Sequence, residues 1–203
     1  MKTVLIANPK GGAGKTTLST NLAGYFASQG EDVWLWDLDK QKSALHWLSL
    51  RPDWLPPIQR LDARNKTEGK DGWLVLDTPA GIAGEPLDEA LKRAHKIIVP
   101  LVPSPYDIEA TRRFLEEILK HKALKKGAVD LAIIGMRVDA RTKAAERLDE
   151  FLEPIDLPVL THLRETMNYV NAAFEGKSIF DVAPSSVERD LEQWQPIIDW
   201  VER

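Results

Sequence analysis

The stretch NPKGGAGKTT, residues Asn8–Thr17, lies near the start of the chain and contains three glycines and two lysines. It follows the apolar run TVLIA (Thr3–Ala7), which is typical of a buried parallel strand. It precedes a run with apolar residues at helical spacing that ends at Gly30. A glycine-rich loop that leads from a strand into a helix and ends in Gly-Lys-Thr is the arrangement that wraps phosphate groups. We therefore expect a nucleotide-binding loop near the start of an α/β fold.

The rest of the sequence alternates short apolar runs with runs at helical spacing. Further strands are expected at 32–37, 73–77, 96–102 and 130–136, with shorter ones near 58–61 and 158–160. Helices are expected at 43–50 and near 86–94, 107–122, 142–153, 166–175 and 186–202, and the remainder of 51–72 is expected to be irregular. This alternation predicts a doubly wound, mainly parallel sheet flanked by helices. Since no linker or internal repeat is visible, residues 1–203 are expected to form a single domain.

The glycines of the loop let successive backbone N–H groups point at phosphate oxygens, and the start of the next helix adds the positive end of its dipole. Lys15 is expected to reach the β- and γ-phosphates, and the Thr16 hydroxyl is expected to bind Mg²⁺. The expected nucleotide contacts are Gly11, Gly12, Ala13, Gly14, Lys15, Thr16 and Thr17. A glycine-rich turn without a ligand is the alternative, which the position between a strand and a helix disfavours.

The loop departs from the usual phosphate-binding pattern in two places. Pro9 stands where G-x-x-x-x-G-K-[ST] has its first glycine, and a second lysine, Lys10, precedes the paired glycines. Because Lys15 already serves the phosphates of its own loop, Lys10 could reach the nucleotide of a second subunit. There it would add positive charge to the transferring phosphoryl group, as an arginine finger does. A solvated surface lysine is the alternative interpretation.

Acidic residues follow two of the expected strands. The strand 32–37 runs into DLDKQ, which places Asp37 and Asp39 at its carboxyl end, where open α/β sheets bind their ligands. Carboxylates there can orient Mg²⁺ and an attacking water. Asp39 could also cap the helix that follows, and the two roles are compatible. Asp77 ends the strand WLVLD and is expected to hold Mg²⁺ through its water shell, as a Walker B carboxylate does.

These segments resemble, in order, the boxes of the ParA/MinD-type ATPases. KGGAGKTT matches the deviant Walker A box K-G-G-x-G-K-T-T, with Lys10 as its signature lysine. DLDKQ matches the D-x-D-x-Q box, although Lys40 stands where proline usually follows the second aspartate. LVLDTPAG (74–81) is similar to the D-x-P-A-G segment, and VPLVPSPYD (99–107) is similar to a segment of the short, ParF-like branch. The resemblance covers nearly the whole chain.

The resemblance implies a P-loop fold and slow, partner-stimulated hydrolysis of ATP with Mg²⁺. It implies that Lys10 contacts nucleotide in the partner subunit of an ATP-dependent sandwich dimer, and that Asp39 activates the attacking water. The expected catalytic residues are then Lys10, Lys15 and Asp39, and the residues expected near Mg²⁺ are Thr16, Asp39 and Asp77. Arg137, which follows the strand expected at 130–136, is a further candidate for the pocket of the adenine base.

The composition excludes several relatives of this family. The chain has no cysteine, which excludes thiolate zinc sites and iron–sulfur clusters, and with them the nitrogenase iron protein and the metal-cluster carriers. No apolar run approaches the roughly 20 residues of a membrane span, and the first apolar run is too short for a signal peptide, so a cytoplasmic location is expected. The final helix has an apolar stripe, but its acidic polar positions would be repelled by anionic lipid, unlike the basic membrane helix of MinD-like proteins. The stripe is therefore expected to pack in the core.

Any contact with nucleic acid requires a local basic patch, because the net charge is −4. One basic run is KHKALKKG (120–127), and a second cluster contains Arg141, Lys143 and Arg147. Helical spacing places Lys143 and Arg147 on one face, which favours the second cluster, although each could be an ordinary solvated face. The resemblance implies that the ATP-bound dimer binds nucleoid DNA without sequence preference. Sequence-specific readout is then expected to belong to a ParB-like or other adaptor protein that also stimulates hydrolysis.

The main interpretation is a dimerising, DNA-associated ATPase that partitions or positions a cargo. A small-molecule kinase or ligase related to dethiobiotin synthetase is a rival, which Lys10 and the D-x-D-x-Q box disfavour. A nucleotide-gated scaffold with almost no turnover and a MinD-like positioning ATPase are further alternatives. The sequence does not indicate whether the cargo is a plasmid, a chromosome, a chemoreceptor cluster or a microcompartment.

Overall fold

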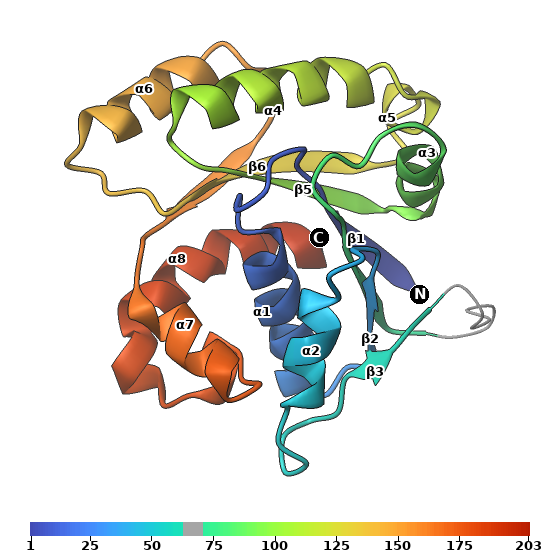
Figure 1. Cartoon of the computed structure of the whole chain (residues 1–203), viewed down its shortest axis with the longest axis vertical. Coiled ribbons are helices and arrows are strands. Elements are labelled where there is room, and N and C mark those ends of the chain that lie inside the picture. Colours follow the sequence, from blue (N-terminus) through green and yellow to red (C-terminus); the bar gives the residue numbers. More distant parts are fainter. Residues whose placement is uncertain (63–70) are drawn as a thin grey trace.

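A computed structural model describes residues 1–62 and 71–203 of the protein. Within these residues, seven strands form one sheet in the order β3-β2-β4-β1-β5-β6-β7, and the neighbouring strands are parallel (Figure 1). The strands are β1 (Lys2–Ile6), β2 (Val33–Asp37), β3 (Gln59–Arg60), β4 (Trp73–Asp77), β5 (Lys96–Leu101), β6 (Asp130–Met136) and β7 (Val159–Leu163). The expected parallel sheet is confirmed. Part of the segment expected to be irregular, 63–70, lies outside the described residues.

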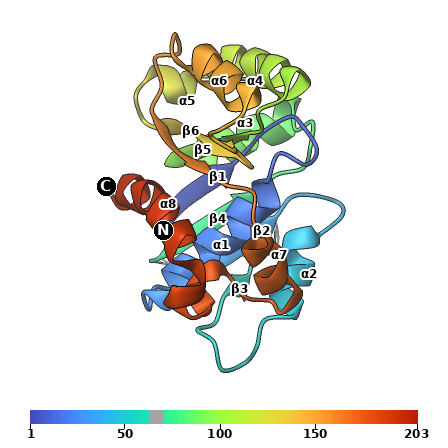
Figure 2. The same ribbon diagram turned by 90° about the vertical axis from the view of Figure 1, so that its left-hand side faces the viewer.

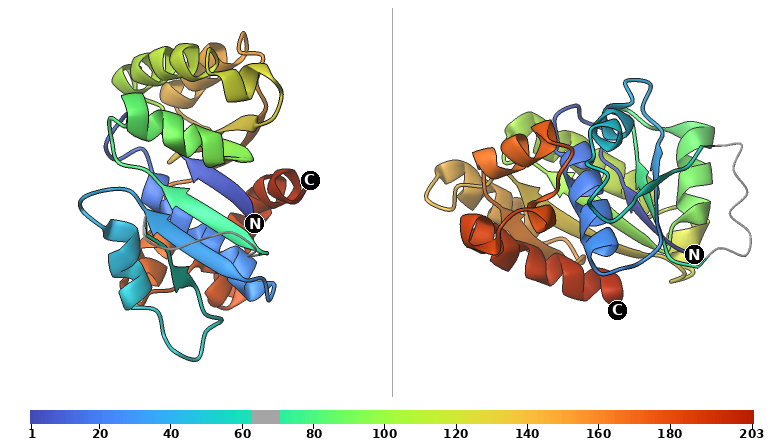
Figure 3. Two further views of the ribbon diagram at one scale, coloured as in Figure 1. Left: turned by 90° about the vertical axis from the view of Figure 1, so that its right-hand side faces the viewer. Right: turned by 90° about the horizontal axis from the view of Figure 1, so that it is seen from below.

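Helices cover both faces of this sheet (Figures 1 and 2). One face carries α3 (Gly84–Arg93), α4 (Pro105–Ile118), α5 (Lys122–Lys125) and α6 (Lys143–Leu152). The other carries α1 (Lys15–Ser28), α2 (Ser43–Ser49), α7 (Met167–Phe174), the short helix Ile179–Asp181 and α8 (Pro184–Glu202). The view from below in Figure 3 shows α1 between α2 on one side and α7 with α8 on the other. The sheet therefore separates two hydrophobic cores, as expected of a doubly wound fold.

The central strand β1 shows how the apolar run specifies this layering. Val4 and Ile6 belong to the core beneath α1 and α8, whereas Leu5 and Ala7 belong to the core beneath α3 and α4. All four side chains are fully buried. Because side chains alternate between the two faces of a strand, a continuous apolar run fits only a strand that is covered on both sides.

Parallel pairing brings the ends of the strands to one edge of the sheet. Ile6, the last residue of β1, is in register with Asp77 at the end of β4. Asp77 is in turn in register with Asp37 at the end of β2. The loop after β1 and the two aspartates therefore lie at the same edge, where α/β folds bind their ligands.

One expected helix differs from the structure. The helix expected over 107–122 is divided into α4, which ends at Ile118, and α5, which begins after His121. His121 Nδ1 accepts a hydrogen bond from the N–H of Ala123 at 3.3 Å, so this side chain caps a new helix. At the other end, Ser104 caps α4 and Pro105 occupies its first turn, which begins the helix earlier than expected.

The apolar stripe of the last helix, α8, packs in the core as expected. Trp194 and Val201 are each 1% exposed and belong to the same core as α1. Among residues 1–62 and 71–203, no helix combines the length and the apolar character that crossing a membrane would require.

Candidate nucleotide-binding site

The loop that joins β1 to α1 has the backbone geometry of a phosphate-binding loop. Gly12 and Gly14 adopt left-handed φ angles of 77° and 92°, which glycine adopts without strain. At Gly14 a side chain is also excluded by space, because a Cβ atom would lie 2.6 Å from Cε of Met136. α1 begins at Lys15, and no side chain of the described residues caps it. The N–H groups of its first turn can therefore donate to phosphate oxygens.

Lys15 turns its side chain back into the loop. Its Nζ donates a hydrogen bond to the carbonyl oxygen of Lys10 at 2.8 Å, and the residue is only 8% exposed. Burial lowers the pKa of Lys15, and the carboxylates of Asp77 and Asp39 oppose that shift. The structure thus brings together four of the predicted site residues, Lys10, Lys15, Asp39 and Asp77, and places a partly desolvated ammonium group where the phosphates are expected.

Asp77, at the end of β4, is a buried carboxylate that contacts α1, the helix that follows the phosphate loop. It is 1% exposed, and its oxygens accept hydrogen bonds from Thr16 Oγ1 at 2.8 Å and from Ser19 Oγ at 2.9 Å. The pKa of Asp77 is raised to about 6, mainly because burial disfavours the charged form; the hydrogen bonds from Thr16 and Ser19 oppose the rise, and the nearby charge of Asp37 adds to it. Ser19 is a contact that the sequence did not predict, although its spacing of one helical turn from Lys15 could have indicated it.

Asp37 and Asp39 have different roles in the loop after β2. Asp37 is 1% exposed, and its carboxylate accepts hydrogen bonds from the N–H groups of Asp39 at 2.9 Å and Ala44 at 3.0 Å. Asp39 is half-buried and accepts a bond from the N–H of Gln41 at 2.9 Å. The helix-capping role considered for Asp39 therefore falls to Asp37, because the buried carboxylate reaches the first turn of α2. This capping shapes the turn that presents Asp39 at the edge of the sheet.

The oxygen donors at this edge fit Mg²⁺. The Thr16 hydroxyl and the Asp77 carboxylate are hard ligands that already lie in hydrogen-bond contact. The described residues contain no group of three or more His, Cys, Asp or Glu side chains that could enclose a metal ion. Mg²⁺ is usually held by one or two carboxylates together with substrate phosphates and water, so this sparse donor set suits it.

Lys10 lies in the phosphate loop itself, and Arg137 lies in the segment that follows β6 and contacts that loop. The Lys10 side chain is half-buried, and within residues 1–62 and 71–203 its ammonium group makes no hydrogen bond or ion pair. Arg137 follows β6 with a left-handed φ of 53°, and its guanidinium donates to the carbonyl oxygen of Gly12 at 2.7 Å. In this structure Arg137 therefore contacts the phosphate loop, and its role toward an adenine base stays a prediction.

In the basic cluster of Arg141, Lys143 and Arg147, both arginines are paired with acidic side chains. Arg141 is held by both carboxylate oxygens of Asp139 at 2.9 Å, and Arg147 is paired with Glu150 at 2.8 Å. Lys143 is exposed at the start of α6. The other basic run differs in this respect, because none of its four lysines forms an ion pair within the described residues. These four exposed lysines are Lys120, Lys122, Lys125 and Lys126.

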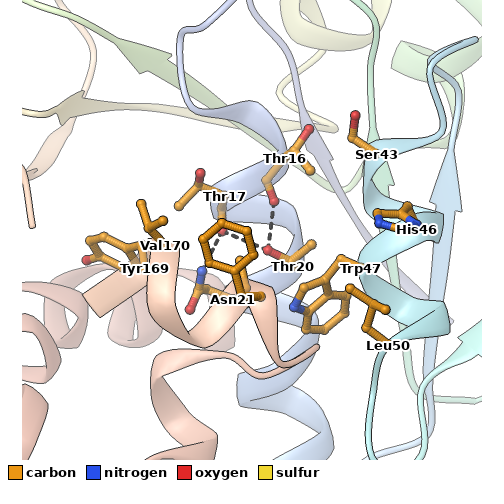
Figure 4. A pocket seen from close by; sticks show the side chains of 12 residues that line it. Thr16, Thr17, Thr20, Asn21, Ser43, His46, Trp47, Leu50, Tyr169 and Val170 are labelled. Atoms are coloured by element: carbon orange, nitrogen blue, oxygen red, sulfur yellow. Dashed lines mark hydrogen bonds between the residues drawn. The ribbon is translucent and has the colours of Figure 1, made fainter. Parts of the chain in front are cut away.

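A groove of about 380 Å³, not predicted from the sequence, opens beside the loop between α1, α2 and α7 (Figure 4). Thr16 and Thr17 of α1 line it near the loop, and Trp47 forms part of the α2 wall. The α7 wall includes Val170 and Phe174, and the latter is 78% exposed. The groove is thus apolar along α2 and α7 and hydroxyl-lined where it meets the loop helix.

Replacing Asp77 with asparagine should stabilise the protein without nucleotide at neutral pH. The pKa of Asp77 is about 6 in the folded protein and lower in the unfolded chain, so the folded state binds the proton more tightly. Stability from this group therefore falls as the pH rises from about 4 to about 6, and the ionised carboxylate costs roughly 1–3 kcal/mol above that window. Urea denaturation should show that Asp77→Asn gains this amount at pH 7 and little at pH 4. A variant no more stable than wild type at pH 7 would contradict the cost of burying this charge.

Comparison with known proteins agrees with this geometry. Maintenance of carboxysome distribution protein A from Halothiobacillus neapolitanus is 28% identical over 193 residues, covering 89% of this chain and 87% of that protein. A solved ATP complex of McdA from Cyanothece has a TM-score of 0.74 at 19% identity and covers 97% of this chain and 96% of its own. MinD from Pyrococcus horikoshii with Mg-ADP has a TM-score of 0.71 at 16% identity, covering 100% and 96%. At these identities the two solved structures show that the fold is shared.

A family model shows more than the fold. The model of the CobQ/CobB/MinD/ParA nucleotide binding domain matches residues 4–179, which include the loop, Asp39 and Asp77. ParA and MinD proteins of this family are ATPases, and solved relatives bind ATP or ADP with Mg²⁺. The chain therefore belongs to the CobQ/CobB/MinD/ParA family of nucleotide-binding domains, among the relatives of the ParA-type positioning ATPases.

Proposed function

We propose that this chain is a ParA-type ATPase that dimerises with ATP and positions a cargo on nonspecifically bound DNA. The observation that carries the proposal is the different setting of the two loop lysines. The Lys15 ammonium is turned inward onto the Lys10 carbonyl, whereas the Lys10 ammonium has no partner among residues 1–62 and 71–203. A lysine fixed at the loop but unengaged by its own chain suits a contact made by a second subunit. Such a protein would be cytoplasmic and associated with the nucleoid.

In the proposed reaction a water molecule attacks the γ-phosphorus of ATP. A new P–O bond forms, the bond to the β–γ bridging oxygen breaks, and ADP and phosphate leave. Asp39 orients the water and takes up its proton, and Lys15 balances charge on the β- and γ-phosphates. Thr16 and Asp77 would hold Mg²⁺, which would further neutralise the charge of the phosphates. Lys10 of the second subunit adds positive charge at the transferring group.

DNA binding should be confined to the ATP state, because one subunit offers few phosphate contacts and a dimer doubles them. Each contact should lower log K by about 0.9 per log unit of salt. Removing Arg141, Lys143 and Arg147 together should flatten this salt dependence and leave ATP binding intact. Fluorescence anisotropy of a random duplex, titrated from low to high salt with ATP-trapped protein, measures the slope.

The matched control for this triple variant removes the four lysines of the 120–126 run. Arg141 and Arg147 are paired with acids, whereas these lysines are not. The quadruple variant therefore tests whether the lysines of the 120–126 run make the DNA contacts instead. An unchanged salt dependence in the triple variant would exclude the cluster of Arg141, Lys143 and Arg147 as the DNA surface. Failure of ATP-trapped wild type to bind DNA at low salt would exclude the nucleoid association altogether.

The groove beside the phosphate loop favours a second candidate function, that of a small-molecule kinase or ligase. A cavity of about 380 Å³ next to the loop could admit the acceptor of a small-molecule kinase or ligase. ATP turnover without any small acceptor, stimulated by DNA or a partner protein, would exclude that function. Phosphate release followed over hours also distinguishes a slow ATPase from a nucleotide-gated scaffold.

The nucleotide-binding site does not indicate which cargo or adaptor protein binds this chain, so both are to be identified by a pull-down experiment. The relative from Halothiobacillus neapolitanus is named for carboxysome distribution, which favours a protein microcompartment among the four cargo candidates. We propose that a ParB-like or other adaptor stimulates hydrolysis by this chain. Pull-down with ATP-trapped Asp39→Ala dimers, compared with Lys15→Ala protein as the control without nucleotide, should retain that adaptor selectively.

A further inference from the structure

Asn8, the residue that follows the β1 core, is fully buried and joins three parts of the fold. Its Nδ2 donates to the carbonyl oxygen of Pro100 at 2.7 Å and to Thr111 Oγ1 at 2.9 Å. Its Oδ1 accepts a hydrogen bond from the N–H of Lys10 at 2.8 Å. Asn8 and Thr111 are both 0% exposed. The carboxamide therefore connects the phosphate loop with the end of β5 and with α4, on the opposite helical layer from α1.

The Lys10 backbone is held on both sides by side chains. Asn8 binds its N–H, and the Lys15 ammonium binds its carbonyl oxygen at 2.8 Å. The preceding carbonyl, that of Pro9, accepts a hydrogen bond from the N–H of Gly81 at 2.8 Å. Because the backbone at Lys10 is fixed, the direction in which its side chain leaves the loop is also fixed.

We propose that Asn8 is the positioning residue that aims Lys10, and that Thr111 fixes Asn8 from α4. The inference rests on the proposed function, because it assigns Asn8 a role only if Lys10 acts in hydrolysis. Asparagine suits this position because one end of its side chain accepts from Lys10 and the other donates twice. An aliphatic side chain could make none of these bonds and would leave buried polar groups unpaired.

Asn8→Ala should slow single-turnover hydrolysis of Mg-ATP by roughly 10²-fold, since a misplacement of about 1 Å in a catalytic group can cost that much. Binding of ATP should be close to wild type, because the Lys15 and Thr16 side chains that are expected to hold the phosphates make no direct hydrogen bond to Asn8. Nucleotide affinity is measured by calorimetry, hydrolysis by release of labelled phosphate, and folding by thermal denaturation. A merely structural role of Asn8 would lower the ATP affinity together with the rate of hydrolysis, so a loss of rate at unchanged affinity identifies a positioning role.

Thr111 offers a matched pair of milder variants outside the nucleotide site. Thr111→Val keeps the shape but removes the hydroxyl, and should slow hydrolysis roughly fivefold to tenfold, the value of one hydrogen bond. Thr111→Ser keeps the hydroxyl and should hydrolyse ATP at close to the wild-type rate. This pair tests the connection even if Asn8→Ala does not fold.

A double-mutant cycle with Lys10 decides whether Asn8 acts through that lysine. In a Lys10→Ala background, Asn8→Ala should cause no further loss of rate, since the group that it aims is absent. An additive loss would overturn the proposal, as would equal rates for Thr111→Val and Thr111→Ser or a parallel loss of ATP affinity. If wild type releases no phosphate at all, the proposed function fails. If wild type is active and Asn8→Ala is equally active, this inference alone fails.

Discussion

Mixing Lys10→Ala subunits with Asp39→Ala subunits should raise ATP hydrolysis well above the residual rate of either variant alone. In a dimer where Lys10 acts across the interface, one site of each mixed dimer combines an intact Asp39 with an intact Lys10 from its neighbour. A charge in the role of an arginine finger is worth roughly 10³–10⁵ in rate, so even partial recovery is measurable. Phosphate release from an equimolar mixture, compared with each variant alone, is the measurement.

The structure explains why this test separates the two possible arrangements. The Lys10 ammonium makes no hydrogen bond or ion pair within the described part of its own chain, although its backbone is held at both ends. If Lys10 acted within its own subunit, every site of the mixture would lack one of the two residues, and no activity could return. Mixed dimers are first verified by tagging one variant. An inactive mixture that contains them would refute the contact across the interface.

Asp39→Ala should bind ATP with near wild-type affinity but hydrolyse it roughly 10²–10⁴-fold more slowly, the usual contribution of a general base. The phosphates are expected to be held by the loop and by Lys15, neither of which hydrogen-bonds to the Asp39 side chain. The turn that carries Asp39 is shaped by Asp37, which caps it from a buried position, so the substitution should leave the fold intact. Size-exclusion chromatography with ATP should show the variant accumulating as a dimer.

Asp37→Ala is the matched comparison for this variant. Because Asp37 is 1% exposed and accepts backbone hydrogen bonds, its removal should lower stability as well as activity. Asp39→Ala should lower activity alone. Wild-type turnover by Asp39→Ala would move the catalytic role to a water held by backbone groups.

Local sequence signals predicted the elements and most of the loop chemistry. The run Thr3–Ala7 predicted β1 because a strand covered on both faces must be apolar at every position. The glycines of the loop indicated its sharp backbone, and Gly12 and Gly14 do adopt left-handed φ angles. Asp77 was expected at the loop because it ends an apolar strand, and it does contact Thr16. The first two predictions succeeded because each depends on residues close together in the chain. The contact of Asp77 with Thr16 spans 61 residues and follows from the parallel pairing of β4 with β1, which brings both strand ends to one edge of the sheet.

Helix ends and charge pairing were predicted less well. The division between α4 and α5 depends on a single capping side chain, His121, which a periodicity over 107–122 does not reveal. The basic cluster at Arg141 and Arg147 reads as free charge in the sequence, yet the structure pairs both with carboxylates. Spacing on a helix indicates which residues share a face, but the partner of a charge depends on rotamers and neighbours.

The sequence by itself determined the family, the parallel sheet and the identity of the two loop lysines. The tertiary structure alone decided which groups support them. Asn8 meets Thr111 across 103 residues, and Ser19 meets Asp77 across 58. Asp37, rather than Asp39, became the buried cap because the register of β2 with β4 places it beneath the surface. Such contacts are invisible in a linear pattern, since a hydrogen bond requires two groups at about 3 Å and only the packed sheet brings these groups together.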